Sequence, residues 1–261
     1  MSQTVFESDG RCFECGVQLR PFLLREGEKP DLVDGLGNYA PCPRCFQIEY
    51  ECMRQKYLRP RKINWLLRKS KLPPLFLEKT FDNFKIYDLR QEKVLRECRS
   101  FAEDFPDRQD RGSCLLFMGP CGTGKGHLSA AIIRGVIEAH MVTALFQKYI
   151  DLKKRIQRSW DRDVEEDEEE IMKSVRAPAL LVLDEIGVQF KSKFERLILY
   201  QIVNHRCEYL RPTILTTNYD LGKLKEVVGE RVFDRILNKE SGNKVFAFNW
   251  PSYRRTLGGK T

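Results

Sequence analysis

No stretch of this 261-residue sequence approaches the roughly 20 consecutive apolar residues that a membrane-spanning helix needs. The first ten residues also lack the basic region and the apolar region of a secretory signal. We therefore expect a cytoplasmic protein with no membrane partner. Hydrophobic residues make up 42% of the chain, which is enough for the core of one large domain, or of a medium domain with a small one.

Regular cysteine spacing is missing from most of the chain. Five of the nine cysteines follow no pattern and are interpreted as ordinary core or surface residues: Cys52, Cys98, Cys114, Cys121 and Cys207. The other four form two Cys-x-x-Cys pairs, Cys12 with Cys15 and Cys42 with Cys45. In a reducing compartment such pairs favour metal over disulfides, and four thiolates match tetrahedral Zn²⁺. About 50 residues can bury little core, so bound zinc would supply folding energy.

Positive charge is concentrated rather than spread along the chain. The net charge is +8, and residues 44–71 hold nine Lys or Arg residues against two acids, Glu49 and Glu51, which leaves that stretch near +7. A concentrated basic segment suits a polyanionic partner. A solvated helix face is an equally good interpretation of the charge alone.

Composition divides the chain into three parts. Residues 1–58 hold the cysteine pairs, residues 59–80 form a basic linker or helix with Trp65, and Pro73 and Pro74 end any helix there. Residues 81–261 alternate short apolar runs with amphipathic stretches, which predicts an α/β domain with a mostly parallel sheet. The expected strands are 113–118, 143–147, 179–183, 213–217 and 245–248. The expected helices are 91–105, 125–140, 149–160, 194–207 and 230–237, and the acidic run 165–170 is expected to be an exposed helix or loop.

The clearest motif is Gly119-Pro-Cys-Gly-Thr-Gly-Lys-Gly, which follows an expected strand and opens an expected helix. This is the setting of a Walker A phosphate-binding loop, where glycines turn backbone N–H groups toward an anion at a helix N-terminus. We expect nucleotide contacts from Gly119, Gly122, Thr123, Gly124, Lys125 and Gly126. The motif departs from its pattern at Gly126, where a Ser or Thr hydroxyl would ligate Mg²⁺. That departure bears on the rate of hydrolysis more than on binding.

Two further strands end in polar residues that suit a nucleotide. Asp184 follows the apolar run 180–183 and suits Mg²⁺, while Glu185 suits polarising an attacking water. Asn218 ends the next strand and can orient that water or contact the γ-phosphate. On their own, the acids would equally fit a turn and Asn218 a helix cap. Their order behind a Walker A motif favours a nucleotide site.

Arg231 and Arg235 lie four residues apart on one expected helix face. Either could reach the γ-phosphate of a neighbouring subunit and stabilise the transition state. A surface helix with ion pairs to Glu230 and Asp234 fits the spacing equally well.

Three segments, 181–189, 229–235 and 248–254, together with 122–128, resemble the DnaC-like family of bacterial replicative helicase loaders over roughly residues 80–260. The resemblance implies an AAA+ domain and a slow ATPase that uses ATP and Mg²⁺, loads a DnaB-type helicase onto single-stranded DNA and works as an oligomer. It favours Arg235 over Arg231 as the arginine finger, and it implies a second sensor arginine at Arg254. It also implies DNA contacts in the segment 148–158, from Lys148, Tyr149, Lys153, Lys154 and Arg155. Phe146 could stack on a base beside them or belong to the core.

The resemblance does not extend to the cysteine module, which could dock on the helicase or bind DNA. Two other functions fit parts of the sequence. One is an IstB-like transposition helper that binds duplex DNA and a transposase. The other is a zinc-dependent adaptor that binds nucleotide with little hydrolysis, as Gly126 allows.

Overall fold

The computed structural model describes residues 58–161, 166–187 and 192–256. The chain divides into two compact units, Met1–Lys62 and Ile63–Thr261, and nearly all described residues belong to the second. The predicted zinc ligands Cys12, Cys15, Cys42 and Cys45 lie outside the described residues. The zinc-binding domain therefore stays a prediction.

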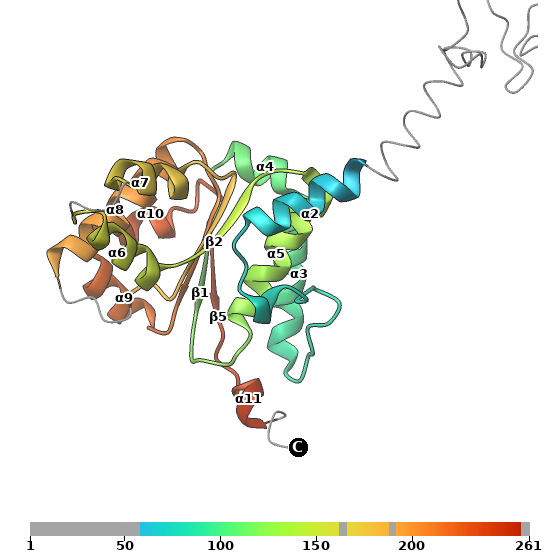
Figure 1. Ribbon diagram of the computed structural model, residues 1–261. Coiled ribbons are helices and arrows are strands. Elements are labelled where there is room, and N and C mark those ends of the chain that lie inside the picture. Colours follow the sequence, from blue (N-terminus) through green and yellow to red (C-terminus); the bar gives the residue numbers. More distant parts are fainter. Residues whose placement is uncertain (1–57, 162–165, 188–191, 257–261) are drawn as a thin grey trace, which may run out of the picture. The chain divides into compact units, whose positions relative to one another are not determined.

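The described residues form one sheet of five parallel strands in the order β2-β3-β4-β1-β5 (Figure 1). Their bounds are β1 (Cys114–Met118), β2 (Ala144–Lys148), β3 (Leu180–Asp184), β4 (Thr213–Thr217) and β5 (Lys244–Ala247). The expected parallel sheet is confirmed, and each expected strand lies within one residue of its observed bounds. Because β3, β4 and β1 are parallel neighbours, their carboxyl ends meet at one edge of the sheet.

Helices cover both faces of the sheet (Figure 1). One face carries α2 (Arg59–Lys69) from Ile63 onward, α3 (Leu89–Glu103), α4 (Phe105–Asp110) and α5 (Lys125–His140). The other face carries α6 (Tyr149–Arg158), α7 (Glu168–Arg176), α8 (Lys193–Glu208), α9 (Leu221–Val228) and α10 (Glu230–Leu237). This three-layer arrangement is the expected α/β architecture, with α5 matching its predicted bounds.

Each strand contributes to two cores because successive side chains point to opposite faces of a sheet. In β3, Leu180 and Val182 pack with the α3 and α5 side, whereas Leu181 and Leu183 pack with the α6 to α10 side. All four are fully buried. Burial on both faces explains why the strands are continuous apolar runs rather than alternating ones.

The packed unit extends toward the N-terminus beyond Phe81, the start that composition suggested. Leu66 and Leu72 are buried in the same core as α5, and the backbone N–H of Phe146 in β2 donates to the carbonyl oxygen of Ser70 at 2.7 Å. Ile63 and Leu66 lie three residues apart, so they share the inner face of α2 while its basic residues face outward. The high charge of this stretch concealed its apolar face.

The described part of the acidic run, residues 166–170, leads into α7, where Asp167 caps the helix by accepting from the backbone N–H of Glu170. Acids are favoured there by the positive end of the helix dipole. Two short elements bracket the site described below: a 3-10 turn, η2 (Pro74–Phe76), and the last helix, α11 (Tyr253–Thr256). Among the described residues, no helix has the length and apolar character to cross a membrane.

Candidate functional site

The glycine-rich loop connects β1 to α5, as the motif predicted. Gly122 and Gly124 have φ angles of +82° and +102°, in the left-handed region that favours glycine. The side chain of Thr123 is buried and its hydroxyl donates to the carbonyl oxygen of Pro120 at 2.8 Å, which holds the loop in a tight curl. The loop therefore ends at the N-terminus of a 16-residue helix, where backbone N–H groups and the helix dipole favour an anion.

Lys125 is the first residue of α5, and only 8% of it is exposed. Its ammonium donates to the carbonyl oxygens of Gly119 at 2.5 Å and Pro120 at 2.8 Å, and to Oδ1 of Asn218 at 3.0 Å. Burial lowers the pKa of Lys125, while nearby negative groups, Asp184 among them, oppose that shift. The structure thus joins the predicted lysine and the predicted sensor asparagine directly, although 93 positions separate them in the chain.

Asp184 and Glu185 follow β3 at the same edge of the sheet, and Thr216 of β4 links them. The hydroxyl of Thr216 donates to Oδ1 of Asp184 at 2.6 Å and accepts from the backbone N–H of Glu185 at 3.0 Å. Burial raises the pKa of Asp184, and the Thr216 hydrogen bond counteracts it. Thr216 was missed by sequence reasoning, because its role depends on β4 lying beside β3.

Glu185 has a φ angle of +60°, which is unusual for a residue with a side chain. Its side chain is exposed and lines the pocket, whereas its backbone is held by Thr216. Strained backbone of this kind persists where the surrounding structure fixes it, and it is concentrated at functional sites. The predicted pair therefore has two environments: a buried Asp184 and an exposed Glu185.

The segment after β5 holds the phosphate loop from outside. The indole N–H of Trp250 donates to the carbonyl oxygen of Thr123 at 2.8 Å, and the backbone N–H of Tyr253 donates to the carbonyl oxygen of Gly122 at 2.9 Å. Arg254, on α11, lines the same pocket as Lys125. The resemblance suggested a second sensor at Arg254, and the structure places that residue beside the loop.

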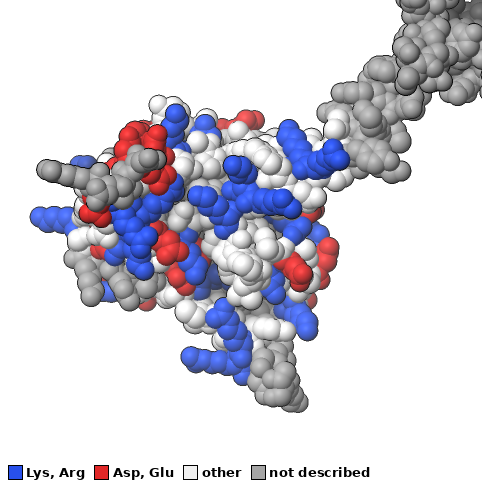
Figure 2. Space-filling view, in the orientation of Figure 1, with Lys and Arg blue, Asp and Glu red and all other residues white. Residues whose placement is uncertain are grey.

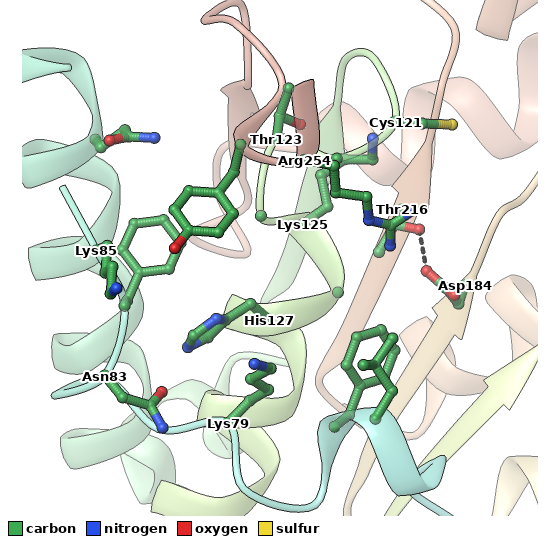
Figure 3. Close-up of a pocket in the computed structure, with 18 of the residues that line it drawn as sticks. Lys79, Asn83, Lys85, Cys121, Thr123, Lys125, His127, Asp184, Thr216 and Arg254 are labelled. Carbon is green, nitrogen blue, oxygen red and sulfur yellow. Dashed lines mark hydrogen bonds between the residues drawn. The ribbon is translucent and has the colours of Figure 1, made fainter. Parts of the chain in front are cut away.

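The pocket around these residues has a volume of about 610 Å³. Figure 3 shows Asp184 and Thr216 on one side of it, and Lys79, Asn83, Lys85 and His127 on the other. The second side comes from the chain between η2 and α3. It is tied to α5 where Nε2 of His127 lies 2.8 Å from the carbonyl oxygen of Thr80, and where the ring of His127 meets that of Phe84 edge-on. Burial lowers the pKa of His127.

The ring of Phe76 lies directly against Gly126, where a side chain would otherwise stand. A Cβ built on Gly126 would stand 2.6 Å from Cζ of Phe76, so the ring occupies the space of a Ser or Thr at this position. A Mg²⁺ ion in this pocket would therefore be held by the carboxylate of Asp184, the phosphates and water. The residues fit such an ion, since Thr216 bonds one oxygen of Asp184 and leaves the other to a metal.

The two candidate arginine fingers lie on α10, and neither lines the pocket of its own chain. Arg231 is exposed, and Arg235 is half-buried with a guanidinium nitrogen 3.8 Å from a carboxylate oxygen of Glu208. An arginine that acts on a neighbouring subunit must lie away from its own nucleotide, and both residues meet that condition.

Basic residues gather over α6, but only part of the predicted nucleic-acid set is available (Figure 2). Tyr149 is 2% exposed, and its hydroxyl donates to the carbonyl oxygen of Glu195. Phe146 is also buried. Neither ring can stack on a base in this structure, because the hydrophobic faces of β2 and α6 turn them into the cores.

The cations of this group divide into paired and exposed residues. Lys153 pairs with Glu195 at 2.8 Å, and Arg155 pairs with Glu166. Lys148 and Lys154 are exposed, and no carboxylate of the described residues lies within 4 Å of either ammonium. These two lysines are the ones free to meet a phosphate backbone.

Within the described residues, no group of three or more His, Cys, Asp or Glu side chains is placed to hold a metal ion by itself. Cys121 lies exposed at the pocket, and Cys98 and Cys114 are buried. The predicted zinc site would have to form from the cysteine pairs outside this part of the chain.

Comparison with known proteins places this chain among ATP-binding proteins. The family model described as "IstB-like ATP binding protein" matches residues 49–255. The replicative helicase loader DnaC of Buchnera aphidicola subsp. Acyrthosiphon pisum is 33% identical over 199 residues, 76% of this chain and 78% of that protein. DnaC of Escherichia coli K12 is 32% identical over 203 residues, 77% of this chain and 80% of that protein. A crystal structure of the DnaC helicase loader matches with a TM-score of 0.60 and 26% identity, covering 67% of this chain and 99% of that one.

Proposed function

The chain belongs to the AAA+ family of DnaC-like helicase loaders and IstB-like ATP-binding proteins, and we propose that it loads a DnaB-type hexameric helicase onto single-stranded DNA under the control of ATP. The nucleotide part of this proposal is carried by the meeting of Lys125, Asp184, Glu185 and Asn218 around one pocket beside the phosphate loop, and the loader part by the similarity to DnaC. We place this activity in the cytoplasm.

Each of these residues has a role that its environment supports. The loop N–H groups and Lys125 bind the phosphates, so the ammonium exchanges its present carbonyl partners for phosphate oxygens. Asp184 would hold Mg²⁺, which supplies positive charge against the phosphates when bound. Glu185, exposed in the pocket, polarises the attacking water, and Asn218 orients it beside Lys125.

Hydrolysis requires a neighbour in this proposal. Arg235, or Arg231, would reach the γ-phosphate bound by an adjacent copy of the chain, which makes the active form an oligomer. Turnover would be slow because Gly126 contributes no metal ligand. A slow ATPase suits a switch: ATP holds the assembly on single-stranded DNA, and hydrolysis releases the loader from the loaded helicase.

DNA contacts are assigned to the exposed lysines of β2 and α6, Lys148 and Lys154. Helicase docking is assigned to the cysteine module with bound zinc, because the resemblance to the loaders does not extend to this part of the chain. The same module could instead bind DNA, and the experiment below distinguishes the two.

The first experiment is a pull-down of the cognate DnaB-type helicase with and without ATP. Wild type should capture the helicase, and a Cys42→Ser/Cys45→Ser variant should fail to capture it while still binding ATP. If wild type captures no helicase under any nucleotide condition, the loader proposal fails. Binding of duplex DNA and a transposase would then support an IstB-like transposition helper, the alternative function within the same family.

A second measurement separates a switch from a non-catalytic adaptor. The Glu185→Gln variant should bind ATP and hydrolyse it about 10²–10⁴-fold more slowly than wild type. An adaptor would show the same negligible hydrolysis in both proteins.

A further inference from the structure

A second polar group faces the pocket far from the phosphate loop in sequence. Gln91 in the first turn of α3 is 0% exposed and lines the pocket. Its Oε1 accepts from the backbone N–H of Tyr87 at 2.8 Å and from that of Asp88 at 3.2 Å. Both partners are donors, so the atom that faces them must be the oxygen and the other must be the NH₂ group.

The amide nitrogen of Gln91 is left without a partner. Nε2 is buried and lies close enough to the Tyr87 hydroxyl to counteract the rise that burial causes in the pKa of that phenol, but no acceptor in the described part of the chain meets it with hydrogen-bond geometry. A buried donor without an acceptor destabilises a protein, so its retention calls for an explanation. The oxygen is already accounted for, because it completes the capping box of α3 with Asp88. The NH₂ group has no such structural role.

The side chains that line the pocket with Gln91 indicate which kind of ligand group its amide could bind. The rings of Phe84, Tyr87 and Tyr253 line the same pocket as Gln91, with Tyr87 and Tyr253 at a centroid distance of 5.9 Å. Phe84 also lies against Gly124 of the phosphate loop, so this aromatic part adjoins the loop itself. His127, whose ring meets that of Phe84, lies across the pocket from Asp184 (Figure 3). A flat ring with acceptor nitrogens at its edge matches these neighbours.

We propose that Gln91 is a specificity-determining residue that reads the nucleotide base, with its Nε2 donating to a ring nitrogen of adenine. This inference rests on the proposed ATP site and assigns the base to the aromatic part of that pocket. Tripolyphosphate carries three linked phosphates without a base. It can contact the loop and Lys125, but it has no ring nitrogen to accept a hydrogen bond from Gln91. The ratio of the dissociation constants for the two ligands therefore isolates the contribution of the base.

The test uses the full chain with Gln91→Glu, at pH 8. Glutamate keeps the oxygen that caps α3, because a capping box accepts Glu and Gln alike, but it replaces the donor by an acceptor. The added negative charge repels the phosphates of both ligands, so isothermal titration should show ATP binding weakened about tenfold or more relative to tripolyphosphate binding. Glu92→Gln, an exposed change on the next residue of α3, is the matched control and should leave both affinities as in wild type.

A second variant guards against a folding defect. Gln91→Met removes the donor without adding charge, and any general loss of structure would weaken both ligands together. The inference holds if either variant changes the ratio of the two affinities. It is overturned if wild type binds ATP and both variants keep the wild-type ratio. A wild type that binds neither ligand would instead overturn the proposed ATP site.

Discussion

The ring of Phe76 lies so close to Gly126 that a Cβ on the glycine would stand 2.6 Å from the ring. The two residues come from the 3-10 turn η2 and the first turn of α5, 50 positions apart. Phe76 also contacts the ring of Phe146 at a centroid distance of 5.6 Å, so β2 limits its movement. The ring of Phe76 therefore fills the space that the Ser or Thr side chain of a regular Walker A motif would occupy.

A Thr at position 126 should be accommodated only when the ring of Phe76 is removed. Gly126→Thr alone should lower the free energy of unfolding by about 1–3 kcal/mol, because the new side chain overpacks against Phe76. In a Phe76→Ala background the same change should cost little and should raise ATP hydrolysis above that of Phe76→Ala alone. Urea unfolding and ATPase assays of the four proteins in this cycle measure both effects. Equal costs of Gly126→Thr in the two backgrounds would contradict the account.

Thr216→Val should impair metal-dependent ATP hydrolysis, although Thr216 is proposed to act only through Asp184 and Glu185. The change removes the hydroxyl that positions Asp184 and holds the backbone of Glu185, so the activity at fixed Mg²⁺ should fall about 10–100-fold. Its matched control is Thr217→Val on the same strand, whose hydroxyl donates to the carbonyl oxygen of Ile186 at 3.0 Å. The control should lower stability but keep the Mg²⁺ dependence of wild type. A Mg²⁺ titration that is the same for both variants would rule out the positioning role.

Arg235→Ala should lower hydrolysis by about 10³-fold or more and leave ATP binding intact, since the proposed finger acts on the neighbour. A Lys125→Ala subunit should no longer bind ATP at its own site, but it still carries Arg235. An equimolar mixture of the two inactive proteins should then regain about a quarter of wild-type activity, because a head-to-tail contact pairs one good site with one good arginine. No recovery on mixing, with Arg231→Ala tested in parallel, would exclude an arginine supplied by the neighbour.

Among the four described cysteines, Cys121 should react first with a thiol reagent. It is exposed in the phosphate loop, whereas burial raises the pKa of the Cys98 and Cys114 thiols and keeps them protonated. ATP at about ten times its dissociation constant should slow this reaction about tenfold, because the bound form is protected. The rate is taken as the difference between wild type and Cys121→Ser, which removes the contribution of every other thiol. An unchanged difference with ATP would place the nucleotide elsewhere.

Replacing the two exposed lysines, Lys148→Met with Lys154→Met, should weaken binding of oligo(dT) and reduce the salt slope by about 1 for each lysine that meets a phosphate. Lys153→Met is the contrasting variant, because Lys153 pairs with the buried carboxylate of Glu195. It should lower stability and leave the salt slope unchanged. Fluorescence anisotropy across a range of salt concentrations measures the slopes, and equal slopes for wild type and both variants would contradict the assignment.

Much of the fold was predictable because β1 and β3 are buried on both faces and read as apolar runs, while β4 is rich in β-branched residues. The phosphate loop, Asp184 and Asn218 were predictable for a related reason: each follows such a run, and parallel strands bring their carboxyl ends together. These residues needed only chain order and sheet topology to be placed at one site.

The rest depended on contacts between distant parts of the chain. Thr216 is one of two threonines in a row, and only the pairing of β4 with β3 shows which of them bonds Asp184. Gln91 is only the first residue of an expected helix by sequence, and the place of its amide is visible only in the folded pocket. Tyr149 was misjudged because a helix beside basic residues can turn its aromatic ring inward.

The phosphate loop is held by hydrogen bonds from residues that follow it by more than 120 positions in the chain. Trp250 donates to Thr123, and Tyr253 donates to Gly122. On the ribosome, β1 and the loop therefore emerge long before the residues that fix them, and domains fold as units during synthesis. A nascent chain that has not reached β5 and α11 would have the motif but not the site. Competence to bind ATP would then arise only near the end of translation, so an interrupted chain could not compete with finished copies for nucleotide.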